Sequence, residues 1–141
     1  MQAIEIAQHG GPDVLTYVTR EDPLCGPDDV LIDVLAIGVN FTDLHQRAGN
    51  YHYGEVAAFI PGSEGAGRVL QVGEKVEGIR EGDDVAFWSP GCGAYAERVS
   101  VRADRTVPLP IGMAPEVAVA LMVQGLTAHY LATSTHVIQL V

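Results

Sequence analysis

Positive charge is scarce in this sequence. Its 141 residues contain a single lysine, Lys75, and eight Lys and Arg together stand against eighteen Asp and Glu, for a formal net charge of -10. A protein that binds a phosphate backbone needs clustered Lys and Arg to displace counterions. The charge balance therefore argues against a nucleic-acid partner, and we expect most of the acidity to serve solubility.

Cysteines and long apolar runs are scarce as well. Two cysteines, Cys25 and Cys92, favour free thiols in a reducing compartment over a disulfide. The richest apolar stretch, 113–126, is interrupted by Glu116 and Gln124, and the N-terminus has no basic region followed by an apolar run. We therefore predict neither a membrane span nor a secretory signal, and expect a soluble, cytoplasmic protein.

Glycine and proline, in contrast, are abundant, with sixteen and eight residues. They separate short apolar runs, several of which alternate polar and apolar residues, and this pattern is typical of strands with one buried face. The sequence thus predicts a mainly β fold in one domain, with turns at 73–78 and 82–83. The predicted strands are 2–7, 14–18, 30–39, 67–72, 84–88 and 94–101.

Two segments have helical character. The first, 42–48, follows the capping residues Asn40 and Thr42 and stops at Gly49. The second, from 115 to about 133, opens with Pro-Glu, which suits a first helical turn. We expect Gly125 to split this second helix.

Common catalytic motifs are not supported. The segment GCGAYA at 91–96 matches the dinucleotide pattern G-x-G-x-x-A, but the residues after it alternate like a strand, which favours a turn. No C-x-x-C, H-x-x-x-H or G-x-S-x-G pattern is present, so neither zinc binding nor covalent hydrolysis is predicted.

Two longer segments carry a family resemblance. GVNFTDLHQRAGNY (38–51) and PGSEGAGRVLQVGEKVEGIREGDDV (61–85) resemble the medium-chain dehydrogenase/reductase superfamily, through the spaced patterns G-x-E-G-x-G, V-x-x-V-G-x-x-V and G-D-x-V. Segments 93–99 and 122–133 continue the resemblance, which covers nearly all of residues 1–133. It implies a GroES-like, partly open β-barrel with a few peripheral helices and no Rossmann domain.

The resemblance also bears on metals. Zinc-dependent members of the superfamily have a cysteine and a histidine where this sequence has Asn40 and Ser63. A neutral amide and a hydroxyl are poor replacements for a thiolate and an imidazole on zinc. The sequence therefore resembles the zinc-free branch, the NADPH-dependent quinone oxidoreductases related to zeta-crystallin, whose signature G-x-N-F-x-D is GVNFTD at 38–43.

That branch implies hydride transfer from NADPH to a quinone or an enone. By resemblance, Asn40 would contact the nicotinamide or the substrate, Tyr51 would line the substrate cleft, and Thr127 would approach the nicotinamide. If His45 lines the cleft, it could donate a proton to a developing quinol oxygen; the alternative is a solvent-facing histidine. Asp43 and Glu64 are expected to fix the local backbone rather than react.

Only eight residues follow Thr133, so the resemblance leads us to expect that the family's cofactor domain has been lost. We predict a catalytic domain at 1–133, and at 134–141 a return strand, STHVIQLV, joined after loss of the nucleotide-binding domain. Such a remnant is expected to be inactive alone and to bind NADPH weakly, because positioning of the hydride donor is lost. The alternative is a non-catalytic GroES-like scaffold that self-associates as a homodimer through the apolar residues of 115–133.

Overall fold

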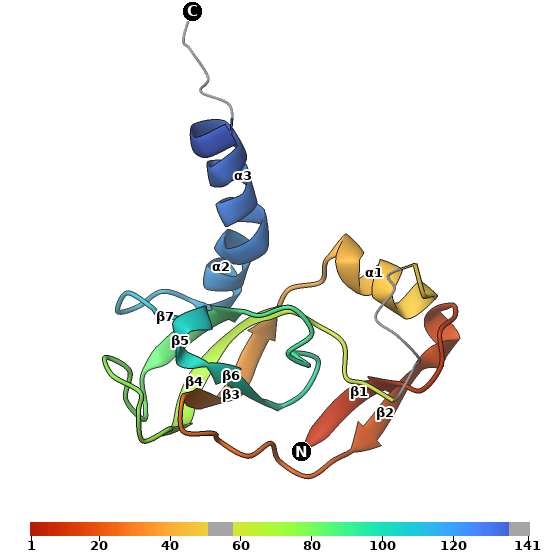
Figure 1. Ribbon diagram of the computed structural model, residues 1–141, viewed down its shortest axis with the longest axis horizontal. Coiled ribbons are helices and arrows are strands. Elements are labelled where there is room, and N and C mark those ends of the chain that lie inside the picture. The colour runs from red at the N-terminus through yellow and green to blue at the C-terminus, as the bar shows by residue number, and fades with distance from the viewer. Residues whose placement is uncertain (51–57, 136–141) are drawn as a thin grey trace, which may run out of the picture.

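The strands of the computed structural model, which describes residues 1–50 and 58–135, form two antiparallel sheets (Figure 1). β1 (Gln2–Ile6) pairs with β2 (Leu15–Thr19) in the smaller sheet. The larger sheet has the order β6-β3-β4-β5-β7. Its strands are β3 (Asp29–Ile37), β4 (Glu64–Val72), β5 (Asp84–Trp88), β6 (Arg98–Arg102) and β7 (Thr106–Pro108). Tyr51 and residues 136–141 of the predicted return strand lie outside the described residues, and the first two residues of that predicted strand, 134–135, are helical.

The prediction of a mainly β fold is confirmed, and the strands described here form two sheets rather than a closed barrel. The predicted strand at 94–101 is partly wrong, because the regular ladder begins only at Arg98 and the preceding residues contribute one isolated bridge, Ala3 with Ala96. β7 was not predicted, since three residues ending in proline are too short for an alternating pattern. The turn at 82–83 is confirmed by Gly82, with φ +87°.

The main core lies on one face of the larger sheet. Alternate residues of β3, Val30 and Ile32, are fully buried and pack with Phe87 of β5 and with residues of β4 and β6. A second cluster lies where the C-terminal helical run meets the sheet. Its buried members are Ala66, Ala86, Ala118, Val119 and Met122.

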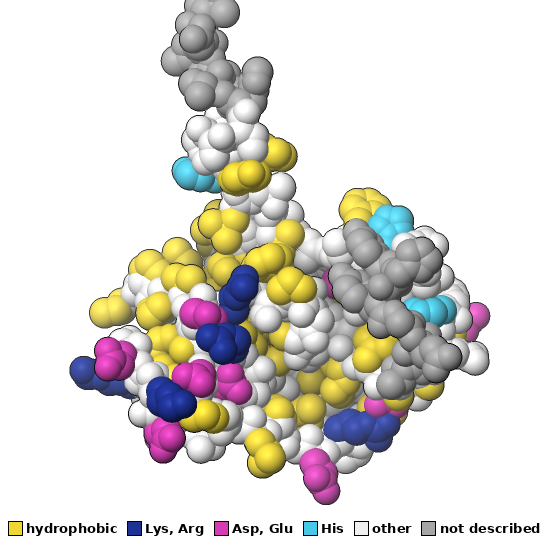
Figure 2. Space-filling view, viewed as in Figure 1, with side chains coloured by type: hydrophobic (Ala, Val, Ile, Leu, Met, Phe, Trp, Pro, Cys, Tyr) yellow, Lys and Arg dark blue, Asp and Glu magenta, His cyan; other side chains and the backbone are white. Residues whose placement is uncertain are grey.

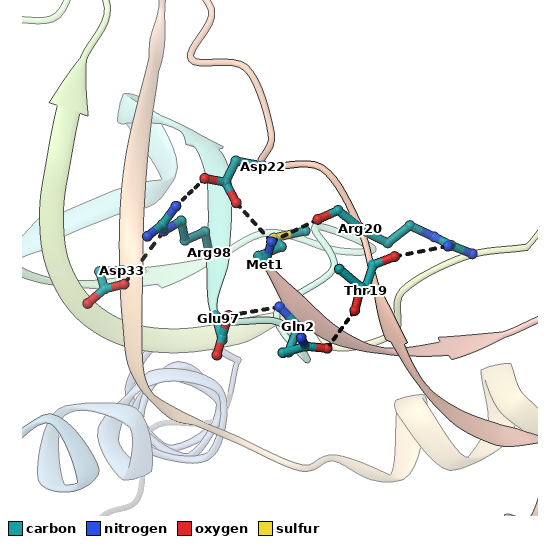
Figure 3. A network of polar contacts seen from close by, with 8 residues as sticks. All are labelled: Met1, Gln2, Thr19, Arg20, Asp22, Asp33, Glu97 and Arg98. Carbon is teal, nitrogen blue, oxygen red and sulfur yellow. Dashed lines mark hydrogen bonds and ion pairs between the residues drawn. The ribbon is translucent and has the colours of Figure 1, made fainter.

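An exposed cluster of charges and polar groups connects the N-terminus to the larger sheet (Figure 3). The Met1 ammonium lies 3.1 Å from the Asp22 carboxylate, and the Arg98 guanidinium also contacts Asp22. The Glu97 carboxylate accepts the Gln2 backbone N–H at 2.8 Å. We call these five residues the N-terminal cluster.

The first predicted helix is confirmed as α1 (Phe41–Ala48). Asn40 occupies its N-cap position, and the Asp43 carboxylate accepts the Asn40 backbone N–H at 2.8 Å, as in a capping box. The helix stops at Gly49, whose φ of +79° lies in the left-handed region that favours glycine.

The second predicted helix is present, but Gly125 does not split it. One helical run comprises α2 (Pro115–Ala120), the π-helical segment η3 (Leu121–Gly125), α3 (Leu126–Tyr130) and the π-helical segment η4 (Leu131–Thr135). Gly125 has ordinary helical angles, φ −66° and ψ −48°, so it continues the run. Its cost to a helix is only about 1 kcal/mol, which the neighbouring turns offset.

This helical run projects away from the sheets (Figure 1). Among the described residues it is the one helix that is long and apolar enough to cross a membrane, by length and composition only, with 21 residues of which few are buried. The sequence did not predict this, because the alanine- and leucine-rich turns after Gln124 offset the polar interruptions. A single helix of this kind is weak evidence for a membrane location.

Candidate functional site

Glu64, at the start of β4, is the centre of a buried polar network. Its side chain is fully buried, and each carboxylate oxygen accepts one hydrogen bond. Oε1 accepts from Asn40 Nδ2 at 2.7 Å, and Oε2 accepts from the Val123 backbone N–H at 2.8 Å. Glu64 thereby connects the loop before α1 to the π-helical turn of η3.

Asn40 is held on both ends of its carboxamide. Nδ2 donates to Glu64, while Oδ1 accepts from Gln124 Nε2 at 3.0 Å. A carboxamide nitrogen carries two hydrogens, so these contacts leave one Nδ2–H of Asn40 for a further acceptor. The side chain is therefore oriented and still able to donate.

Asp43 and Tyr95 extend the network into the domain. The Asp43 carboxylate is 4% exposed and accepts the Tyr95 hydroxyl at 3.1 Å as well as the Asn40 backbone N–H. Burial raises the pKa of Tyr95 well above its ordinary value, and the nearby Asp43 carboxylate raises it further. The phenol thus stays neutral and donates. We call Asn40, Asp43, Glu64, Tyr95 and Gln124 the Glu64 network.

Two glycines provide the space for this network. A Cβ at Gly38 would collide with Oε1 of Glu64, so the first position of the G-x-N-F-x-D signature must lack a side chain. Gly62 has φ +98°, and a Cβ there would lie 2.5 Å from the Tyr95 ring. The sequence motif is therefore explained by packing around Glu64 and Tyr95.

Of the predicted site residues, Asn40 is the one that belongs to the Glu64 network. Thr127 is exposed on α3. It lies three residues beyond Gln124, the residue of the same helical run that donates to Asn40. His45 is exposed on α1, with Nδ1 3.3 Å from Asn50 Nδ2. Tyr51 falls outside the described residues, so its predicted role is untested.

Asn40 is the one member of the Glu64 network that was predicted as a site residue. Gln124 is visible in the sequence only as a polar interruption of an apolar stretch, and this was the one available signal. Tyr95 gave none, because it lies 52 residues from Asp43 in the chain. Glu64 was expected to fix the local backbone; it binds the backbone of Val123, 59 residues away.

No group of three or more His, Cys, Asp or Glu side chains arranged to hold a metal ion occurs among residues 1–50 and 58–135. The zinc-free prediction continues to rest on Asn40 and Ser63. Cys92 is half-buried with its thiol 3.7 Å from the Gly62 carbonyl oxygen. Burial raises the pKa of Cys92 to about 12, which leaves it a weak nucleophile at neutral pH.

Residues 26–111 match the alcohol dehydrogenase GroES-like domain, and the chain belongs to that family. A quinone oxidoreductase of Pseudomonas aeruginosa is 39% identical over 133 residues, which are 94% of this chain and 41% of that protein. The relatives found among curated proteins and solved structures place the domain with the quinone oxidoreductases of the medium-chain dehydrogenase/reductase superfamily, as the sequence motifs predicted.

Solved structures agree with this assignment. The structure of Escherichia coli quinone oxidoreductase complexed with NADPH has a TM-score of 0.92 and 34% identity, and the match covers 99% of this chain and 42% of that one. A mycobacterial protein complexed with NADPH has a TM-score of 0.91 and 40% identity, with 99% and 43% covered. This chain thus spans about two fifths of the length of the relatives it matches.

Proposed function

We propose that this chain forms the catalytic-domain part of an NADPH-dependent quinone oxidoreductase that transfers hydride to quinones or enones. The proposal includes a cytoplasmic, zinc-independent protein with a small-molecule substrate. The observation that carries it is the geometry of Asn40, whose carboxamide is fixed by Glu64 and Gln124 with one N–H left to donate. An N–H of this kind suits a carbonyl oxygen of a nicotinamide or a quinone.

The described residues fit the nicotinamide end of the cofactor better than its phosphate end. Asn40 offers the unused N–H, and the exposed Thr127 offers a hydroxyl. The glycine segment at 91–96 is a turn, with Gly91 and Gly93 at positive φ, and no helix follows it to hold a pyrophosphate. When bound, NADPH would supply the hydride, and Asn40 would orient the accepting carbonyl.

Affinity for NADPH should therefore be low in this chain alone, because the contacts to the rest of the cofactor would come from the part of the relatives that this chain does not span. Hydride transfer by the 141 residues without a complementary domain should be negligible, since positioning supplies much of the rate.

A fluorescence titration of the full chain with NADPH tests the proposal. We expect weak but saturable binding. Asn40→Ala should reduce the affinity for NADPH about tenfold, because it removes the hydrogen bond to a ligand carbonyl that binding takes out of water. Gln71→Ala is the matched control, because it deletes an exposed carboxamide at the far end of β4. Absence of binding by the wild-type chain, or equal loss in both variants, would contradict the proposal.

A second candidate function is self-association as a non-catalytic scaffold. It is favoured by the apolar side chains along the projecting helical run, which Figure 2 shows in yellow on the visible face. Val117, Leu121, Leu126 and Leu131 are each 53–57% exposed. A contiguous apolar surface of this kind is typical of interaction sites.

Light scattering of the wild-type chain and of Leu126→Glu tests this candidate. Self-association predicts a dimer that the variant converts to a monomer, with no change in NADPH affinity. A monomeric wild-type chain at all concentrations would rule it out.

A further inference from the structure

Glu64 has a role that the motif alone does not assign. Its two oxygens face two donors on different elements, and Gln124 donates to the opposite end of the same Asn40 carboxamide. A carboxylate accepts on both oxygens and donates on neither, so Asn40 can satisfy it only with Nδ2 turned toward Glu64.

We propose that Glu64 is a positioning residue that sets the direction of the Asn40 carboxamide and couples it to the π-helical turn through Val123. The proposal rests on the function above in one respect, that the free N–H of Asn40 is what the ligand accepts from. The Glu64 side chain itself is fully buried, and its two hydrogen bonds are to protein groups, Asn40 and Val123.

The π-helical turn supports the coupling. A backbone N–H inside a helix ordinarily donates to a carbonyl of the preceding turn, whereas that of Val123 donates to Glu64 Oε2. Insertion of a side chain into the helical ladder is a recognised cause of such irregular turns, which are frequent at functional sites. Glu64 therefore places Gln124, the next residue, within reach of Asn40.

Replacing Glu64 by its carboxamide analogue should reverse Asn40. In Glu64→Gln, one oxygen remains for the Val123 N–H and the new NH2 group faces Asn40. Asn40 must then present Oδ1 to it, and Gln124, which is exposed, can rotate to match. All hydrogen bonds are retained, but the Asn40 N–H points elsewhere.

NMR of the full chain detects this reversal without any ligand. We expect the Asn40 side-chain amide protons to shift and to exchange about tenfold faster in Glu64→Gln, because they leave a buried carboxylate for an exposed partner. The Val123 amide should keep its protection. Glu97→Gln is the control, since Glu97 also accepts a backbone N–H at 2.8 Å but is exposed.

A second pair of variants tests the coupling by stability. Asn40→Asp alone places two carboxylates together and should lower Tm by about 5 °C. Adding Glu64→Gln restores donor–acceptor matching and should recover most of that loss. Unchanged Asn40 signals in Glu64→Gln, or strictly additive Tm changes in the double variant, would overturn the proposal.

Ligand binding is a separate readout. If the NADPH titration succeeds, Glu64→Gln should weaken it about fivefold while Tm changes little, a split that a purely structural role would not produce. Failure of the wild-type chain to bind NADPH would remove the proposed function and leave the NMR and Tm results to decide the role of Glu64.

Discussion

The Glu64 network and the N-terminal cluster are both polar, but they differ in how far their charged groups are exposed to solvent. The Glu64 network has two carboxylates that are at most 4% exposed, each meeting hydrogen-bond donors from distant parts of the chain. In the N-terminal cluster, Asp22 and Arg98 form an ion pair with each other, and their side chains are 41% and 40% exposed. Water competes for the exposed ion pair and not for the two buried carboxylates, Asp43 and Glu64.

The contrast teaches that charge count is a poor guide to what stabilises this domain. A buried donor that loses its acceptor is left without water to replace it, whereas an exposed ion pair that opens is hydrated at once. Stability, helix placement and orientation of the candidate site should therefore depend far more on Glu64 than on the more numerous charges near Met1.

Deletion of the Glu64 side chain gives the largest expected effect. Glu64→Ala leaves the Val123 N–H and Asn40 Nδ2 without their acceptor in a buried space, and should lower the free energy of unfolding by about 3–5 kcal/mol. Glu97→Ala, which removes an exposed acceptor of a backbone N–H, should cost about 1 kcal/mol or less. Urea denaturation measures the free energy of unfolding of both variants. Equal losses would show that the buried acceptor and the exposed acceptor stabilise the domain to the same extent.

The local part of this architecture could be predicted from sequence. Alternation located β1 and β3, a short apolar run located β5, the capping residues located α1, and the motif identified Asn40. These features depend on neighbouring residues, which determine periodicity, capping and turn conformation. The continuation of the helix through Gly125 could not be predicted, because packing and hydrogen bonds to another element outweigh the weak helix preference of one glycine.

The partners of Asn40 were beyond sequence reasoning for a related reason. Glu64 and Gln124 lie 24 and 84 residues from it, and nothing in their local sequence specifies that they meet. Glu64 could be assigned to a turn, but its buried contact with Val123 exists only once β4 and η3 have packed together.

Filling the space at Gly38 should have the next largest effect. In Gly38→Ala the new methyl group overlaps Oε1 of Glu64, so the carboxylate must move away from Asn40, at a cost of about 1–3 kcal/mol. Gly11→Ala is the matched control, because no atom lies within 4 Å of a Cβ there and φ is −71°. That control should be neutral or slightly stabilising in the same denaturation experiment. A neutral Gly38→Ala variant would show that the network tolerates displacement.

Tyr95 gives a smaller effect with a distinctive pH dependence. Tyr95→Phe removes the hydroxyl that donates to Asp43 and should cost about 1–2 kcal/mol. Because the folded pKa of Tyr95 is raised, its stabilising contribution is complete below the unfolded pKa of about 10 and is lost as pH rises above that value. Denaturation from pH 7 to 11 should show a steeper alkaline decline for wild type than for the variant. Tyr17→Phe, at a 70% exposed position, should leave that decline unchanged.

Asp22 should give the smallest effect, and one that salt removes. A hydrogen bond from the Met1 ammonium lowers the pKa of Asp22, and Arg98 lowers it further. A lowered folded pKa means that the contribution is present above the unfolded pKa, near 3.9, and is lost as pH falls through the folded value. Asp22→Asn should therefore lower Tm slightly at pH 7 and low ionic strength, and not at all at about 1 M salt, where the Debye length is about 3 Å. A loss that persists in high salt, and that the exposed substitution Glu77→Gln does not reproduce, would mean that the N-terminal cluster is shielded from solvent in the way the Glu64 network is.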